Sequence, residues 1–229
     1  MNNVKEKFKK NFFEKDAWQN ACLVCGIDEV GRGCLAGPLV TGTVILPQGT
    51  TFRFLKDSKV MSEEEREKAY DWITQNCFYS TAITSHRQID KLNIYQSTLL
   101  TMKKSLLQLL QSVPFEHEKI KYILVDAMPV SLSTLDFYKN IDIKFFDKGE
   151  SLSSTIAAAS IVAKVTRDRL MKRINEIFPK FNFSENKGYG TADHVKGLKE
   201  LGPTIIHRTT FITKIGAASN EVQLQQQLF

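Results

Sequence analysis

The stretch Gly26-Ile27-Asp28-Glu29-Val30-Gly31-Arg32-Gly33 decides how the rest of this sequence is interpreted. It closes a short apolar run that begins at Cys22, which predicts a strand ending in two adjacent carboxylates and followed by an arginine between glycines. Neighbouring acids repel each other, so a buried pair needs a cation, a shared proton or solvent. An isolated Asp-Glu pair is more often a solvated turn. The remaining motifs of the chain therefore decide between a turn and a metal site.

The composition is that of a soluble globular protein, and its basic balance allows an anionic partner. A chain of 229 residues with 42% hydrophobic content is long enough for one large α/β domain, with or without a helical appendage. The net charge of +6 permits binding to nucleic acid but does not demand it. The four cysteines form no disulfide framework or second CxxC pair for zinc, and we interpret them as reduced thiols.

The sequence contains no targeting or membrane signal that we can identify. The first residues are charged throughout and hold no apolar core of a signal peptide. No later segment has the roughly 18 consecutive apolar residues of a membrane span. We therefore expect a cytoplasmic protein that does not enter a membrane.

Hydrophobic periodicity predicts alternating strands and helices. We expect strands at residues 22–28, 39–46, 78–83, 120–125 and 141–146, and helices at about 62–72, 95–110, 153–177 and 192–201. The first two strands should form a hairpin, and Ser62 with Glu65 is a capping box that opens the first helix. The predicted divisions are a lead-in at 1–20, one catalytic domain at 21–211 and a polar tail at 212–229.

Acidic side chains follow several of the predicted strands. A strand, helix, strand order favours parallel pairing, and ligands of such sheets gather beyond the carboxyl ends of the strands. Four acids should converge there: Asp28, Glu29, Asp126 and Glu150. Neighbours on a regular strand point to opposite faces, so Asp28 and Glu29 can share a metal only if the strand ends or bulges beside Gly31.

These acids favour hard divalent cations. With no His/Cys metal set and no Ser-His-Asp triad, the acids fit Mg²⁺ or Mn²⁺, which prefer oxygen ligands. Such a site suits phosphodiester hydrolysis by two ions about 4 Å apart, which activate a water and stabilise the leaving 3′ oxygen. The products would carry 5′-phosphate and 3′-hydroxyl ends.

Several ordered motifs together closely resemble prokaryotic ribonuclease HII, over about residues 22 to 211. They are the runs Gly26 to Gly33, Asp57-Ser58-Lys59, Lys148-Gly149-Glu150, Ala157 to Asp168, Lys187 to Thr191 and His207-Arg208. The resemblance implies an α/β fold of the RNase H type, with a mixed central sheet flanked by helices and a small C-terminal helical part. It also implies an endonuclease that cleaves the RNA strand of RNA·DNA hybrids, including on the 5′ side of single ribonucleotides in duplex DNA.

The resemblance also assigns roles to the acids. Asp28, Glu29 and Asp126 would be catalytic metal-binding carboxylates, and Glu150 would be the fourth. The type II enzymes usually carry Asp at the position of Glu150, so Asp168 is held as a reserve candidate.

Further residues would contact the substrate. By the same resemblance, the backbone of Gly31, Arg32 and Gly33 would read the ribose 2′-OH, which distinguishes RNA from DNA, and Tyr189 would stack on the junction sugar. Taken alone, Tyr189 is more often a packing residue. Four basic side chains are candidates for holding phosphates, with solvated surface charge as the equal alternative: Lys59, Lys187, His207 and Arg208. We expect His194 to belong to the surface or to a helix cap, and Lys164 and Asp168 to pair.

Two other functions stay open at this point. The basic balance alone would also suit a nucleic-acid-binding module without catalysis, although the acids disfavour it. Glu150 points mildly to the sister ribonuclease HIII, but Gly31-Arg32-Gly33 and the short segment before the first strand disfavour that family. We expect a monomer, and Gln227-Leu228-Phe229 is a faint hint of a sliding-clamp partner.

Overall fold

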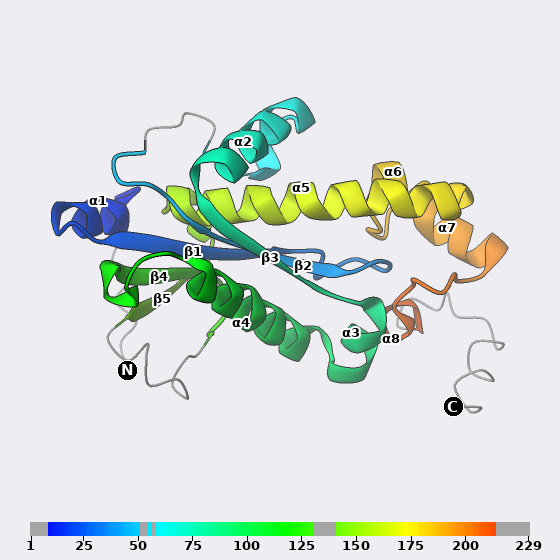
Figure 1. Ribbon diagram of the computed structural model, residues 1–229. Helices are drawn as coiled ribbons and strands as arrows, with labels where there is room; N and C mark the ends of the chain where they lie inside the picture. Colours follow the sequence, from blue (N-terminus) through cyan, green and yellow to red (C-terminus); the bar gives the residue numbers. More distant parts are fainter. Residues whose placement is uncertain (1–8, 51–54, 56–57, 131–140, 214–229) are drawn as a thin grey trace. The chain divides into compact units, whose positions relative to one another are not determined.

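The structure is a computed structural model that describes residues 9–50, 55, 58–130 and 141–213 (Figure 1). It divides into two compact units, each built from three segments of the chain. The first unit takes residues 1–29, 41–82 and 102–165, and the second takes residues 30–40, 83–101 and 166–229. The predicted division into lead-in, catalytic domain and tail stays a prediction, and most of the predicted tail lies outside the described residues.

Five strands and eight α-helices are found in the described part of the chain. The strands are β1 (Leu23–Val30), β2 (Leu39–Ile45), β3 (Phe78–Thr84), β4 (Ile120–Asp126) and β5 (Asp142–Phe146). The helices are α1 (Phe12–Gln19), α2 (Glu63–Asn76), α3 (His86–Leu92), α4 (Ile94–Ser112), α5 (Ser154–Ile177), α6 (Phe183–Asn186), α7 (Ala192–Leu201) and α8 (Thr209–Ile212). All five predicted strands and all four predicted helices are therefore present. Among the described residues, no helix has the length and apolar character to cross a bilayer.

The first unit is built on a five-stranded sheet of order β3-β2-β1-β4-β5. Strand β1 pairs in parallel with β4, and β4 pairs in parallel with β5, as the alternation with helices predicted. The link between β1 and β2, residues 31–38, is too short for a parallel crossover, so these neighbours form the expected hairpin. The sheet is thus mixed, and acidic residues lie at the carboxyl ends of its parallel strands.

Helices cover both faces of this sheet (Figure 1). On one face, α2 and α5 pack on β2 through a buried apolar cluster that includes Val44, Ile73 and Val162. Close approach to α5 requires glycine at Gly42, where an added Cβ would lie 2.3 Å from the Ala159 carbonyl oxygen. On the other face, Ser105 of α4 hydrogen-bonds to Thr43 and, through its carbonyl oxygen, to Ser80.

Helix α1 fixes the start of α5. Phe13 packs on the rings of Tyr122 and Phe146, which lie on β4 and β5. The buried Glu14 carboxylate accepts hydrogen bonds from the main-chain N–H and the hydroxyl of Thr155, at 3.1 and 2.9 Å. A carboxylate at a helix N-terminus meets unpaired N–H groups and the positive end of the helix dipole. The predicted lead-in therefore orients the helix that passes behind β1.

The second unit has its own core around α7. Buried apolar side chains from the β1–β2 link, α5 and the C-terminal helices form one cluster: Leu35, Ala36, Met171, Phe181, Phe183, Leu198 and Ile212. Helix α3 was not predicted. Its signal is Ser85, whose hydroxyl accepts the Gln88 N–H as an N-cap, followed by one buried apolar residue, Ile89.

Candidate active site

Three carboxylates come together at the carboxyl ends of neighbouring strands in the first unit. Ile27 of β1 is in register with Val125 of β4, so Asp28 and Asp126 are the next residues of adjacent parallel strands. Glu150 follows β5 on a short 3₁₀ turn, Gly149–Ser151. One carboxylate oxygen from each of these three acids lies within 4.8 Å of the others. The convergence predicted for these three residues is found in the structure.

The burial of this cluster favours a cation. Asp28 and Glu150 are each 3% exposed. Burial raises the pKa of Asp28 well above its ordinary value, and the carboxylates of Glu29, Asp126 and Glu150 raise it further. Three oxygen ligands and no sulfur or imidazole suit a hard divalent ion, whose charge would offset the repulsion between the acids. The residues present therefore fit Mg²⁺ or Mn²⁺.

Main-chain and hydroxyl groups hold the three acids in place. Asp126 Oδ1 accepts the Gly149 N–H at 2.7 Å, which ties the β5 turn to β4. Glu150 Oε2 accepts the Ser58 N–H at 3.2 Å. The Ser58 and Ser160 hydroxyls lie 2.9 Å apart, and a hydrogen bond from Ser160 lowers the pKa of Asp28.

Two of the predicted acids are not members of this cluster. Asp28 shares a strand face with Gly26, which abuts Thr155 of α5, so a regular strand turns Glu29 to the opposite face. The strand does continue past Asp28, through Val30. Glu29 still lies close enough to raise the pKa of Asp28. The reserve candidate, Asp168, belongs to α5 in the second unit, and the expected pairing of Lys164 with Asp168 stays a prediction.

The glycine loop that follows β1 is held by two buried arginines of the second unit. Arg167 donates to the carbonyl oxygens of Pro38, Lys187 and Ala36, at 2.8, 2.7 and 3.2 Å. Arg208 donates to the carbonyls of Arg32 and Gly37. At Gly31, with φ +97°, an added Cβ would lie 2.4 Å from Arg167 Nε. Only glycine fits there, whereas the exposed Gly33 has open space around it.

Tyr189 lies on a loop of the second unit, and its ring faces Arg167. The Arg167 guanidinium carbon is 5.8 Å from the centre of the Tyr189 ring, which is 39% exposed. Burial of the remainder raises the pKa of Tyr189 to about 12. The ring is therefore backed by a cation on the protein side and is partly open to a ligand.

The basic residues expected to hold phosphates differ in exposure. His207 and Arg208 are 3% and 0% exposed, and their polar atoms contact protein groups, so in this structure neither presents itself to a phosphate. The Lys187 ammonium donates to the Ser184 carbonyl. The Lys59 side chain is outside the described part of the structure.

The supporting roles of three residues were not predicted from the sequence. Ser160 and Arg167 lie on α5. His194 was expected at the surface or in a helix cap, and it is buried in the first turn of α7, where its N–H is part of the helix cap. Ser160 and Arg167 look like ordinary helix residues, because nothing local signals burial. For His194 the one usable signal is its place three residues after Thr191, whose hydroxyl accepts the His194 N–H.

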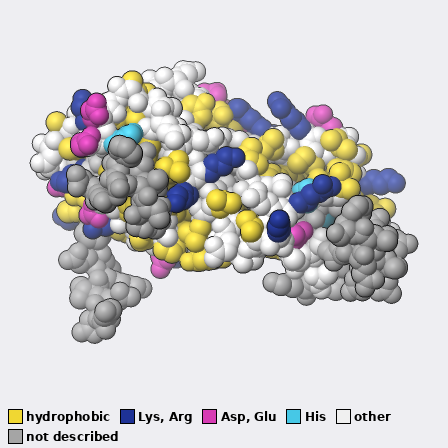
Figure 2. Space-filling view, turned by 60° about the horizontal axis from the view of Figure 1, so that its bottom comes forward, with side chains coloured by type: hydrophobic (Ala, Val, Ile, Leu, Met, Phe, Trp, Pro, Cys, Tyr) yellow, Lys and Arg dark blue, Asp and Glu magenta, His cyan; other side chains and the backbone are white. Residues whose placement is uncertain are grey.

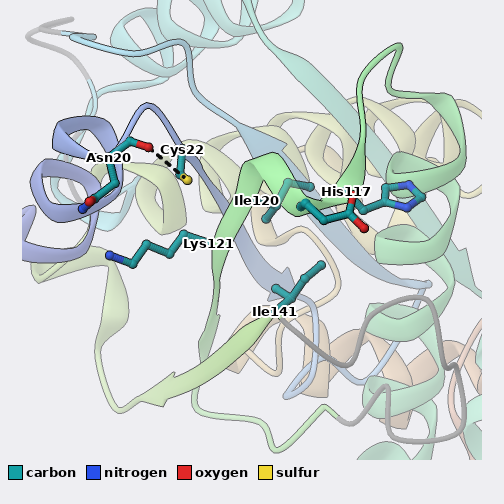
Figure 3. Close-up of a pocket in the computed structure, with 7 residues that line it drawn as sticks. Asn20, Cys22, His117, Ile120, Lys121 and Ile141 are labelled. Carbon is teal, nitrogen blue, oxygen red and sulfur yellow. Dashed lines mark hydrogen bonds between the residues drawn. The ribbon is translucent and has the colours of Figure 1, made fainter.

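A cavity of about 300 Å³ in the first unit lies away from the carboxylates. Figure 3 shows its lining, which includes Cys22 before β1, Ile120 at the start of β4 and Ile141 before β5. These positions mark the amino ends of the parallel strands, whereas the acids follow their carboxyl ends. The cavity is therefore separate from the candidate site.

Comparisons with known proteins identify the family. A family model described as Ribonuclease HII matches residues 25–214. The ribonuclease HII of Caldanaerobacter subterraneus subsp. tengcongensis is 40% identical over 214 residues, which are 93% of this chain and 83% of the relative. That of Lachnoclostridium phytofermentans is 44% identical over 193 residues, 84% of this chain and 71% of the relative.

A solved structure supports the same assignment. The ribonuclease H2 from Pyrococcus horikoshii OT3 superposes with a TM-score of 0.68 at 25% identity, covering 85% of this chain and 96% of that one. The RNase H-like α/β fold expected from the sequence is thus confirmed. The chain belongs to the ribonuclease HII family.

Proposed function

We propose that this enzyme incises on the 5′ side of single ribonucleotides embedded in duplex DNA, as well as within longer RNA·DNA hybrids, by two-metal-ion hydrolysis. Membership of the ribonuclease HII family supports endonucleolytic cleavage of the RNA strand of RNA·DNA hybrids, because that is the activity of the family. The observation that carries the proposal is the set Asp28, Asp126 and Glu150, with ligand oxygens within 4.8 Å.

The acids would act as a rigid frame for divalent ions. When bound, such ions lower the pKa of a coordinated water and stabilise negative charge on a leaving oxygen. Asp28, Asp126 and Glu150 would hold them, with Glu29 as a further candidate from the adjacent position. The hydrogen bonds from Gly149 and Ser58 hold Asp126 and Glu150 before substrate arrives, so little reorganisation is needed. Mg²⁺ and Mn²⁺ are both compatible with this set of oxygens.

The second unit would recognise the substrate. The fixed main chain of Gly31, Arg32 and Gly33 is suited to hydrogen-bonding a ribose 2′-OH, because glycines permit close approach of a nucleic-acid strand. Tyr189, backed by Arg167, is suited to stacking on the sugar at the junction. We assign Arg208 and His207 to the support of these loops, whereas Lys187 and Lys59 stay candidates for phosphate contacts.

The net charge agrees with contact to a phosphate backbone. Figure 2 shows Lys and Arg side chains on the face in view, with Asp and Glu side chains and hydrophobic ones among them. The net charge of +6 favours contacts that carry no sequence information. The residues that gave only a faint hint of a sliding-clamp partner, Gln227 to Phe229, lie outside the described residues, and the monomeric state stays a prediction.

The test is mapping of the cleavage site on a DNA duplex that contains one ribonucleotide, with Mg²⁺ and with Mn²⁺. We expect incision on the 5′ side of the ribonucleotide, leaving a 3′-hydroxyl and a 5′-phosphate, and no cleavage of an all-DNA duplex. Incision elsewhere, or cleavage confined to hybrids with several ribonucleotides, would reject the proposed specificity. Binding without cleavage under both metals would instead favour a binding module.

A further inference from the structure

A pair of buried histidines connects the C-terminal segment to the main chain of Tyr189. His207 Nδ1 accepts the Thr204 N–H at 2.9 Å. The Nε2 atoms of His207 and His194 are 3.0 Å apart, and His194 Nδ1 is 2.8 Å from the Tyr189 carbonyl oxygen. These contacts form an unbroken chain within the second unit.

The direction of each hydrogen bond in this chain is fixed. A main-chain N–H can only donate, so His207 Nδ1 carries no proton and its Nε2 carries one. That proton is donated to His194 Nε2, which leaves the His194 proton on Nδ1 for the Tyr189 carbonyl. Both rings must be neutral, and burial lowers both pKa values, that of His207 to about 4. A further imidazole near His207, that of His86, also lowers the pKa of His207.

Two phenylalanine side chains form an apolar cage that packs against the His194 and His207 rings and restricts their orientation. The side chains of Phe181 and Phe183 stack on each other with centroids 5.5 Å apart. Phe183 meets the His194 ring edge-on at 5.3 Å, and Phe181 lies 5.0 Å from the His207 ring. Hydrogen-bonded rings in such a cage have few alternative orientations.

This series of hydrogen bonds ends at Tyr189, whose main chain and side-chain ring are both held by neighbouring groups. The Tyr189 carbonyl accepts from His194 and from the Thr191 N–H at 2.8 Å, while its ring lies over the Arg167 guanidinium. We propose that His194 and His207 are positioning residues, which fix the Tyr189 main chain and so set how tightly the enzyme binds a ribonucleotide junction. This rests on the proposed role of Tyr189 in the preceding subsection.

The decisive variant is His194→Phe, which keeps a ring in the cage and removes both ring hydrogen bonds. We expect the KM for a duplex with one ribonucleotide to rise about 10-fold, the scale of one net hydrogen bond, with kcat changed less than about 3-fold. His194→Asn retains a side-chain donor near the place of Nδ1 and should recover most of the loss. An unchanged KM in His194→Phe, or an equal loss in His194→Asn, would overturn the proposal.

A double-mutant cycle separates positioning from general destabilisation. In a Tyr189→Ala background the ring is absent, so adding His194→Phe should change KM less than about 2-fold. A full 10-fold loss in that background would contradict action through Tyr189. The matched control is His117→Phe, because the His117 ring also contacts a main-chain carbonyl, that of Leu110 at 2.7 Å, but in the first unit. It should leave KM unchanged.

A measurement without substrate keeps this proposal distinct from the proposed function. Amide hydrogen exchange over residues 187–191 should be about 10-fold faster in His194→Phe than in the parent enzyme, and unchanged in His117→Phe. Unchanged exchange in His194→Phe would overturn the positioning role. If exchange rises but the parent enzyme fails to cleave the single-ribonucleotide duplex, the proposed function fails and the positioning of the Tyr189 loop stands.

Discussion

Asp28 is the residue on which catalysis and stability make opposite demands. Its carboxylate is buried beside three other acids, which raises its pKa and makes its charged form costly without a cation. Asp28→Asn should therefore reduce cleavage of an RNA·DNA hybrid at least about 100-fold while binding of the hybrid persists. Without divalent ions, and at a pH above the raised pKa of Asp28, the same change should raise Tm by about 2–4 °C, because one repulsive charge is removed.

Cleavage assays, binding by fluorescence anisotropy and thermal melts check this prediction. Asp147→Asn is the control, since Asp147 is exposed and follows β5 by one residue. It should leave all three measurements unchanged. Full activity of Asp28→Asn would show that the cluster is not the catalytic centre.

Ser160 tunes the same carboxylate. Its hydroxyl hydrogen-bonds to Asp28, which lowers the pKa of that acid, and lies 2.9 Å from the Ser58 hydroxyl. Groups that orient a metal ligand typically contribute 10- to 100-fold to metal affinity. Ser160→Ala should therefore weaken Mn²⁺ binding about 10-fold by calorimetry, whereas Ser112→Ala, at the end of α4, should not change it. Equal affinity in both variants would remove Ser160 from the site.

Among the elements, α2 has the clearest local signal. The Ser62 hydroxyl accepts the Glu65 N–H at 3.1 Å, and Glu65 accepts the Ser62 N–H at 2.9 Å, the capping box predicted from the sequence. Ser62→Ala should lower the free energy of unfolding by about 1 kcal/mol and Tm by about 2–4 °C, and Ser62→Thr should restore most of it. Chemical denaturation measures both. A loss in Ser62→Thr as large as in Ser62→Ala would contradict a capping role.

Contact between β2 and α5 depends on the absence of a side chain. An alanine Cβ at position 42 would lie 2.3 Å from the Ala159 carbonyl oxygen, a backbone atom that moves only with the helix. Gly42→Ala should therefore cost about 1–3 kcal/mol of unfolding free energy. Gly33→Ala, with open space around it, should stay within about 0.5 kcal/mol. Equal stability of the two variants in urea titrations would contradict this packing.

Local sequence patterns predicted the helices and strands better than they predicted the buried residues that support the candidate site. Apolar runs and the capping box gave every strand of the sheet and α2, α4, α5 and α7, because periodicity reports which face is buried. The alternation of strands and helices predicted parallel pairing, which brings the strand-end acids Asp28 and Asp126 to the same edge of the sheet. Sequence alone treats arginine and histidine as surface residues, so the burial of Arg167, Arg208 and His194 was not foreseen. Their partners are main-chain carbonyls and a second histidine, and no sequence pattern encodes those contacts.

At the scale of the whole molecule, the carboxylate cluster couples folding to protons and to metal. A carboxyl whose pKa is raised on folding contributes stability that is fully present below its unfolded pKa, about 3.8, and that is lost as the pH rises through the folded pKa. The metal-free protein therefore loses this contribution as Asp28 ionises. A divalent ion binds the ionised form, so it should restore stability where the protons have left.

The last prediction is that the gain in Tm caused by Mg²⁺ or Mn²⁺ grows with pH. At a free-ion concentration 100 times Kd the stabilisation is about 2.7 kcal/mol, roughly 5–10 °C for a chain of this length, and it should shrink as acid protonates Asp28. Thermal melts with the ion and with a chelator at each pH check this prediction. The difference between the two Tm values removes the effect of titrating groups that do not bind the ion, including His207. Asp28→Asn should show a smaller gain with less pH dependence. A gain in the parent enzyme that does not change with pH would mean that the ion binds elsewhere than at Asp28, Asp126 and Glu150.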